Sequence, residues 1–270
     1  MKNKQLEKLE YKSGFVNYGY KVDGGWEHTS PVNPDIKDVI IKHTPVKNNM
    51  KNNLGAIFYP IEDINGKAIP FDSLYLPYIW REIYFEGLYK DIVNQRTDMV
   101  ILDIGAQVGL TVKYFREHAK RVVAVEPSSE NFKALKANKD HNKWDNVELV
   151  NVALADKDGE MMLNTLDQNR TCHSVIRQYG QGGEMVKTMA FDTLFKKYKI
   201  DKVDFCKFDV EGAEDMILRS EGFKKVAPKI NSIEVEFHFD TWTLLVEYMG
   251  TLGYKARRYP SSAIVVLFYR

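Results

Sequence analysis

From Asp98 to the end of the chain, short apolar runs alternate with amphipathic stretches, and this alternation constrains the fold more than any other feature. A short apolar run between turn residues is typical of a buried strand, and apolar residues three and four apart are typical of a helix. The predicted strands are 99–104, 121–125, 147–152, 203–210, 230–237, 254–259 and 263–268. The predicted helices are 107–119, 128–138, 191–198, 213–219 and 240–249. Such alternation indicates an α/β fold with a parallel sheet covered on both faces.

The last two predicted strands are separated only by Pro260, Ser261 and Ser262. A parallel pair needs a crossover of a dozen or more residues, so these strands must pair antiparallel. We therefore expect a mostly parallel sheet that ends in an antiparallel C-terminal hairpin.

Residues before position 96 have a different character. Lys, Asn and turn-forming residues are frequent at 1–53. Short strands are predicted at 38–43 and 54–60, and an aromatic-rich helix is predicted at 71–93. We divide the chain into an N-terminal accessory region, 1–95, and a second domain, 96–270.

Composition excludes several classes of protein. The formal net charge is only +1, whereas domains that bind nucleic acid are usually strongly basic. Two cysteines are too few for a disulfide framework. No apolar run is long enough to span a bilayer, and no secretory signal is recognised at the start of the sequence. We expect a cytoplasmic protein without nucleic-acid or membrane partners.

The segment Asp103–Gly109 (DIGAQVG) lies where the first predicted strand turns into the first predicted helix. Ligands of open α/β sheets bind at this edge, and Gly105 and Gly109 allow a tight turn and close packing there. The spacing D-x-G-x-x-x-G differs from the G-x-G-x-x-G of dinucleotide sites. A carboxylate at Asp103 would repel a pyrophosphate and attract a ligand that bears an ammonium and a sulfonium.

Glu126 ends the second predicted strand, about 20 residues after Gly105, the place from which an acidic residue binds the ribose of a nucleotide. Taken alone, Glu126 also fits an exposed strand end. Together with the glycine loop, it favours a nucleoside with free ribose hydroxyls.

Four segments, in this order, resemble the FkbM family of S-adenosylmethionine-dependent methyltransferases: ILDIGAQVG, AVEPSSENFKALKAN, NVALADKDGE and FDTLFKKYKIDKVDFCKFDVEGAEDMIL. The resemblance covers residues 87–238 and is most specific at 207–214 (KFDVEGAE). It implies a class I methyltransferase, with a Rossmann-like seven-stranded sheet, that O-methylates a hydroxyl of a sugar or other small molecule. The accessory region would shape the acceptor pocket or an interface.

The resemblance also implies S-adenosyl-L-methionine as cofactor and assigns residues to it. Asp103, Gly105 and Gly109 match positions around the methionyl part, and Glu126 matches the ribose position. The remaining positions that we assign to the cofactor are Ala106, Gln107, Pro127, Ala153, Leu154 and Asp209.

Transfer to a hydroxyl needs a base for the departing proton. The candidates are His238, Asp209 and Glu236, which follow or end the strands beside the glycine loop. We expect His238 to be the base, because its unperturbed pKa is about 6.5. Asp209 would hold cofactor or substrate, and strand alternation puts Glu236 on the same side as His238. We expect Glu211 and Glu214 to cap the following helix.

Several alternatives stay open. Asp209, Glu236 and His238 are a donor set for a divalent ion, but no tight metal-binding spacing accompanies them, so we predict no metal. An NAD-dependent oxidoreductase and a non-catalytic nucleoside-binding module fit the same sheet. The acceptor is expected to be a small molecule or a glycan, and a nitrogen acceptor and any oligomeric state stay open.

Overall fold

The structure is a computed structural model of the 270-residue chain. It describes residues 6–10, 16–22, 25–28, 61–62, 68–69, 83, 87–93, 96–164, 174–176, 183–239, 242–259 and 264–270. The chain divides into two compact units, Met1–Leu88 and Tyr89–Arg270. The role of residues 1–95 as an accessory region stays a prediction.

Among its described residues, the first unit contains two small antiparallel sheets. One has the strands β1 (Leu6–Glu10), β2 (Val16–Val22) and β3 (Gly25–His28), and the other pairs β4 (Ile61–Glu62) with β5 (Ala68–Ile69). The strands predicted at 38–43 and 54–60 lie outside the described residues, as does most of the helix predicted at 71–93. The described end of that segment contains α3 (Lys90–Val93), which belongs to the second unit.

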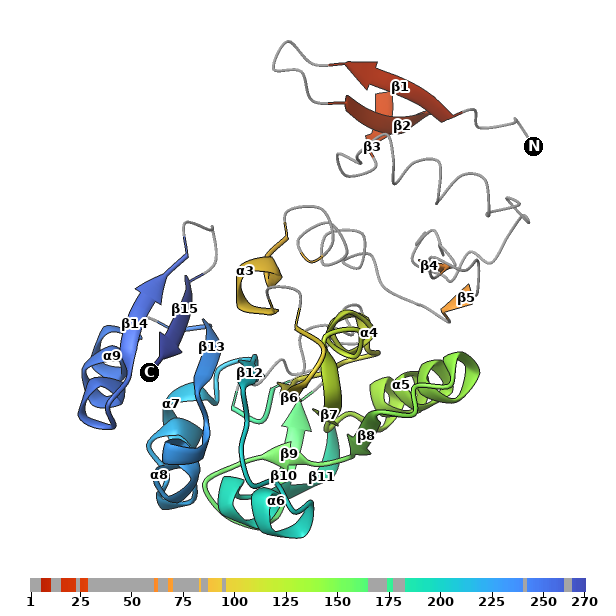
Figure 1. Ribbon diagram of the computed structural model, residues 1–270. Coiled ribbons are helices and arrows are strands. Elements are labelled where there is room, and N and C mark those ends of the chain that lie inside the picture. The colour runs from red at the N-terminus through yellow and green to blue at the C-terminus, as the bar shows by residue number, and fades with distance from the viewer. Residues whose placement is uncertain are drawn as a thin grey trace. The chain divides into compact units, whose positions relative to one another are not determined.

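A seven-stranded sheet forms the centre of the second unit, in the order β14-β15-β13-β12-β6-β7-β8. Its strands are β6 (Met99–Ile104), β7 (Ala119–Val125), β8 (Val147–Val150), β12 (Phe205–Phe208), β13 (Ser232–Phe237), β14 (Lys255–Arg258) and β15 (Ile264–Tyr269). Figure 1 shows β6 between β7 and β12. The five strands from β13 to β8 are parallel, and β15 pairs antiparallel with both β13 and β14. The predicted α/β fold and C-terminal hairpin are confirmed.

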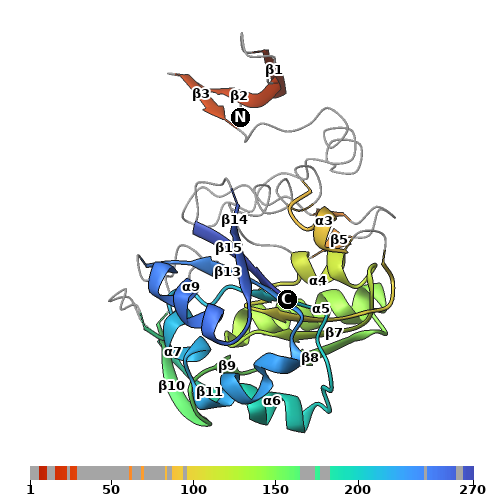
Figure 2. The same cartoon turned by 60° about the vertical axis from the view of Figure 1, so that its left-hand side comes forward.

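Helices cover the sheet because both of its faces are apolar. They are α4 (Leu110–Phe115), α5 (Ser129–Asn142), α6 (Phe191–Lys197), α7 (Glu214–Leu218), α8 (Glu221–Val226) and α9 (Trp242–Thr251), with a 3₁₀ turn at Ala227–Lys229. Figures 1 and 2 show α9 beside the β14–β15 edge and α5 beside β8 at the other edge. Among the described residues, no helix has the length and apolar character needed to cross a membrane.

Strand alternation divides the buried side chains between the two faces. Leu102 of β6 and Phe208 of β12 belong to a core cluster with Phe191 of α6 and Phe223 of α8. Their neighbours along the strands point the other way. On that face, Phe205 of β12 meets the ring of Phe115 at 5.5 Å between centroids.

The first crossover helix is shorter than the predicted helix 107–119. Gln107 and Gly109 have positive φ angles of 51° and 100°, so the chain between β6 and α4 is a loop, and β7 already begins at Ala119. The next helix begins where Ser128 predicts, because the Ser128 hydroxyl accepts a hydrogen bond from the Asn131 N–H.

The second unit also contains a small three-stranded sheet that we did not predict from the sequence. It contains β9 (Ala153–Leu154), β10 (Gly159–Asn164) and β11 (Gly183–Met189), with β10 antiparallel and β9 parallel to β11. Met162 and Met185 face each other across β10 and β11 and remain about half exposed. Half-exposed strands of mixed polarity lack the apolar run that marks a buried strand.

Candidate active site

The glycine loop between β6 and α4 packs against the end of β12. Gly105 has a φ of 79°, and a Cβ there would overlap the backbone oxygen of Asp209. No other residue type fits this backbone without displacing β12. A Cβ on Gly109 would lie 2.6 Å from Leu135 of α5, so the absence of a side chain at Gly109 allows the loop to pack closely on α5.

Glu126 joins this loop to the start of α5. Its Oε2 accepts a hydrogen bond of 2.8 Å from the Gln107 N–H, and its Oε1 accepts one of 2.9 Å from the Ser128 N–H. The side chain is buried, and burial raises its pKa to about 7 although these hydrogen bonds oppose the shift. A carboxylate oxygen has two acceptor positions, and one hydrogen bond to Oε2 is described. Contact of Glu126 with a ribose stays a prediction.

Asp103 lies at the carboxyl end of β6, as predicted, but it is fully buried and does not line a surface. Its Oδ2 accepts a hydrogen bond from the Thr111 hydroxyl, and its Oδ1 has no hydrogen-bond partner among the described residues. Burial raises its pKa to about 6. Contact of Asp103 with a cofactor stays a prediction.

Among the described residues, Lys207 is the principal cation near these carboxylates, and we assigned it no role from the sequence. Its Nζ donates hydrogen bonds of 3.1 Å to the Gly105 backbone oxygen and to Asp209 Oδ2, and lies 3.9 Å from Asp103 Oδ1. Burial lowers the pKa of Lys207, but these carboxylates outweigh burial and raise it above its ordinary value. Lys207 therefore holds the glycine loop and Asp209 together. Because residues 207 and 209 share a side in an extended strand, alternation in KFD is the signal that could have found it.

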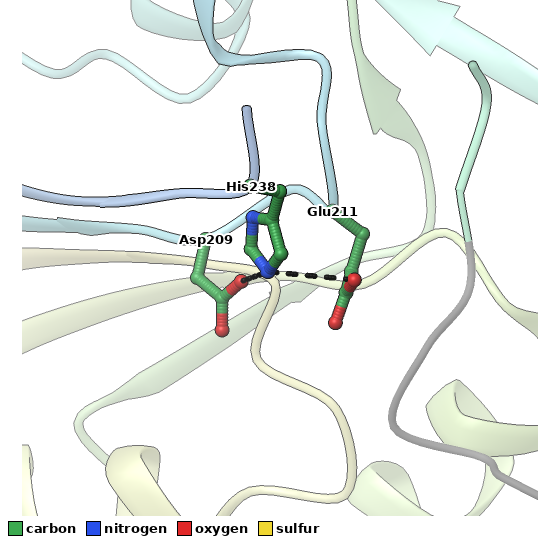
Figure 3. Close-up of side chains that lie close together, drawn as sticks. All are labelled: Asp209, Glu211 and His238. Carbon is green, nitrogen blue, oxygen red and sulfur yellow. Dashed lines mark ion pairs between the residues drawn. The ribbon is translucent and has the colours of Figure 1, made fainter. Parts of the chain in front are cut away.

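His238 follows β13 and lies among carboxylates (Figure 3). Its Nε2 is 3.4 Å from Glu211 Oε2, 3.8 Å from Asp209 Oδ1 and 4.0 Å from Glu236 Oε1. The structure thus brings together the three predicted catalytic residues and adds Glu211, which we expected to act only as a cap. Burial lowers the pKa of His238, but the Glu214 hydrogen bond and the surrounding carboxylates outweigh it and raise the pKa to about 9.

The other glutamates differ in their surroundings. Glu214 is buried, and its Oε1 accepts a hydrogen bond of 2.9 Å from the Gly212 N–H and lies 2.8 Å from His238 Nδ1. Glu214 thus holds the turn before α7 through Gly212 and also contacts His238. The N-cap residue of α7 is Ala213, and no side-chain hydrogen bond caps it, so the predicted capping by Glu211 and Glu214 is not seen there. Glu236 keeps 40% of its side chain exposed, and Asp209 together with burial raises its pKa to about 7.

The remaining predicted cofactor residues lie near the ends of strands. Ala153 and Leu154 form β9 and are buried, as is Ala106 in the glycine loop. Gln107 and Pro127 are partly exposed. The Gln107 N–H donates a hydrogen bond to Glu126, and Pro127 follows Glu126 in the chain. Their contact with a cofactor stays a prediction.

A seven-stranded sheet with its last strand antiparallel, a glycine loop after the central strand and an acidic residue at the end of the next strand define a class I methyltransferase fold. The chain contains the methyltransferase FkbM domain at residues 103–257. It belongs to the FkbM family and is a methyltransferase.

Similar proteins are known by sequence and by structure. The chain is 27% identical over 192 residues to the hexuronic acid methyltransferase AglP of Haloferax volcanii, covering 68% of this chain and 77% of AglP. A crystal structure of a methyltransferase FkbM from Methylobacillus flagellatus aligns with a TM-score of 0.48 and 17% identity, over 71% of this chain and 48% of that one. An rRNA methylase from Streptococcus thermophilus aligns with a TM-score of 0.45 and 12% identity, over 68% and 94% of the two chains.

Proposed function

We propose that this protein transfers a methyl group from S-adenosyl-L-methionine to a hydroxyl oxygen of a sugar. One observation supports this most directly: Asp209 belongs to both halves of the site. Its backbone oxygen packs on Gly105 of the glycine loop, and its carboxylate lies 3.8 Å from His238 Nε2. A donor bound over the loop and an acceptor bound at His238 would therefore be neighbours, and proximity is the main requirement of such a transfer.

The residues around the loop fit the donor nucleoside. Glu126 Oε2 has a free acceptor position for a ribose hydroxyl, and the loop backbone near Gly105 carries no side chain. The carboxylates of Asp103, Asp209 and Glu236 give this edge an excess of negative charge, which favours a cation over a diphosphate. When bound, S-adenosyl-L-methionine supplies an electrophilic methyl group on a positively charged sulfur.

The cluster around His238 would receive the acceptor hydroxyl. Glu236 is the most exposed of the carboxylates near Nε2, at 40% against 27% for Asp209 and 16% for Glu211. An entering hydroxyl can approach Glu236 with the least displacement of protein, so we assign it the proton that the hydroxyl loses. His238 then orients the acceptor oxygen, and the base role predicted for it from the sequence passes to Glu236.

The relative of known substrate acts on a hexuronic acid, and this supports a sugar acceptor. The acceptor that we propose is a hexuronic acid or a neutral sugar in a small glycoside or a glycan. The cytoplasmic location expected from the sequence stays a prediction.

The test is methyl transfer from methyl-labelled S-adenosylmethionine to a panel of hexuronic acid glycosides, neutral glycosides and amines. We expect a base-stable methyl ether on a sugar. Glu236→Gln should lower kcat by about 10²–10⁴-fold, the usual contribution of a general base. As the matched control, Glu160→Gln on exposed β10 should keep the wild-type rate.

Two results would contradict this function. A base-labile methyl ester or an N-methyl product would show that the acceptor atom is not a hydroxyl oxygen. Binding of S-adenosylmethionine with no transfer to any acceptor would favour a nucleoside-binding module.

A further inference from the structure

Asp209, Glu211 and His238 each direct one potential ligand atom to the same point, and we propose that they bind a divalent metal ion there. Each of the three residues offers one ligand atom, and these atoms all lie within 4.8 Å of one another. Figure 3 shows the imidazole between the two carboxylates, with Nε2 facing both. The donor set differs from the one considered on sequence grounds, because Glu211 takes the place of Glu236.

The orientation of the His238 imidazole is a second observation that supports a metal site. Glu214 Oε1 lies 2.8 Å from Nδ1, the nitrogen that faces away from the two carboxylates. With a metal bound at Nε2, the ring would keep its proton on Nδ1 and donate it to the Glu214 carboxylate, and histidine ligands of metals are commonly held in this way. Glu214 is itself buried and fixed by the Gly212 N–H. The ring is thus preorganised to donate through Nε2.

The two carboxylates are also held in position. Glu211 has a φ of 56°, uncommon for a residue other than glycine, and its backbone oxygen accepts a hydrogen bond of 2.6 Å from the buried Ser174 hydroxyl. Lys207 donates to Asp209 Oδ2 and leaves Oδ1 facing His238. Each carboxylate therefore points one oxygen at the same place as Nε2.

The separations suit a metal ion. Ligand atoms about 2.1 Å from a metal lie about 3.0–3.4 Å apart in octahedral and tetrahedral sites. The distance from Nε2 to Glu211 Oε2 is 3.4 Å, and that to Asp209 Oδ1 is 3.8 Å. The ligand atoms of Asp209 and Glu211 lie within 4.8 Å of each other, so the carboxylates would move somewhat closer to a bound ion. One imidazole nitrogen with two carboxylate oxygens suits Mn²⁺, Fe²⁺, Co²⁺ or Zn²⁺.

Three protein ligands leave coordination positions open, as in catalytic metal sites. An acceptor hydroxyl bound at an open position loses its proton more readily, and Glu236 is close enough to take it. The role of the ion in activating an acceptor hydroxyl rests on the proposed methyl transfer. The proposal that the ion binds does not depend on that function.

The test measures Mn²⁺ binding to the full chain, first stripped with a chelator, in the absence of cofactor and acceptor. Equilibrium dialysis should find one Mn²⁺ per chain. Glu211→Gln and His238→Gln should each weaken binding by at least about 10-fold, and Glu214→Gln should weaken it by about 10–100-fold through the ring orientation. Glu160→Gln should bind as the wild type does. Circular dichroism of each variant without metal separates loss of binding from loss of fold.

A measurement on the wild type alone keeps the test independent of the variants. Pulsed electron paramagnetic resonance of bound Mn²⁺ (electron spin echo envelope modulation) should show nitrogen coupling from one imidazole. No stoichiometric binding, no nitrogen coupling, or equal affinity in the wild type and a folded Glu211→Gln variant would each overturn the proposal. A chain that binds one Mn²⁺ through His238 but transfers no methyl group supports the metal site and contradicts only the proposed function.

Discussion

At the scale of single residues, Glu126 is the clearest case of a proposed cofactor-binding residue whose burial costs stability. Its carboxylate is buried, and three hydrogen bonds from the Gln107 and Ser128 backbone and the Asn131 side chain do not fully offset burial. The group therefore binds its proton more tightly in the folded chain than in the unfolded chain. Such a carboxyl is expected where a ligand, and not the fold, needs the charge.

The pH dependence of stability tests whether burial raises the pKa of Glu126 in the folded chain. Burial raises the pKa of Glu126 from 4.5 to about 7, so its contribution to the free energy of unfolding is largest below pH 4.5 and falls as the pH rises to about 7. The loss is about 3 kcal/mol at most. We expect Glu126→Gln to remove this part of the decline, measured as the unfolding midpoint from pH 4.5 to 8. An exposed control, Glu160→Gln, should follow the wild type, and a decline that persists in Glu126→Gln would contradict the assignment.

Gly105 is required by both its backbone angle and its neighbour. Because its φ is 79° and a Cβ would overlap the Asp209 backbone oxygen, Gly105→Ala should destabilise the fold by at least about 2 kcal/mol. Gly250→Ala in α9 is the control, because nothing lies within 4 Å of a Cβ there and alanine favours a helix by up to about 1 kcal/mol. Denaturant unfolding should separate the two variants, and equal stabilities would show that the loop does not pack on β12.

At the scale of elements, the parallel register of three strands brings charged residues together on one face. Lys207 of β12 lies opposite Asp103 of β6 and Glu234 of β13. Both carboxylates are buried, and burial raises the pKa of Glu234 to about 8. The Lys207 ammonium is thus the cation that keeps the centre of the sheet from carrying uncompensated negative charge.

Removing the Lys207 ammonium should lower the free energy of unfolding. Lys207→Met leaves Asp103 and Asp209 without their nearest cation, and breaking a buried ion pair costs about 3–5 kcal/mol. Lys225→Met breaks the exposed pair with Asp192 and should cost less than about 1 kcal/mol. Urea unfolding of both variants at pH 8 makes the comparison. A loss for Lys207→Met no larger than that for Lys225→Met would contradict the role assigned to Lys207.

Helices and strands that have a clear local pattern, such as an apolar run or a capping residue, could be predicted from the sequence. Those that depend on contacts with the rest of the fold could not. The β6 strand is apolar throughout, and the Ser128 cap marks the start of α5, so both begin as expected. The paired strands β10 and β11 expose Met162 and Met185, so their apolar residues do not mark a buried face. The helix α8 has only six residues, which is too short for a clear helical repeat of apolar residues. In the site, strand alternation could have placed Lys207 beside Asp209, but its pairing with Asp103 depends on the strand register. The position of Glu211 depends on a left-handed backbone conformation that no local pattern shows. The roles of Asp209, Glu236 and His238 in the reaction stay predictions.

At the scale of the whole molecule, the second unit contains every residue of the proposed site, from Asp103 to His238. The FkbM domain covers the same part of the chain, at residues 103–257. The proposed function therefore depends on the fold of this unit and on one property of its sheet, which is negative charge gathered at the carboxyl edge beside the glycine loop.

Calorimetric titration of the full chain with S-adenosylhomocysteine and, separately, with NAD⁺ tests that property most directly. We predict one S-adenosylhomocysteine per chain, no measurable heat with NAD⁺, and binding at least about 10-fold weaker in Glu126→Ala, since one good hydrogen bond to a charged group is worth about 1.5–3 kcal/mol. Binding of NAD⁺ in preference to S-adenosylhomocysteine would contradict the account.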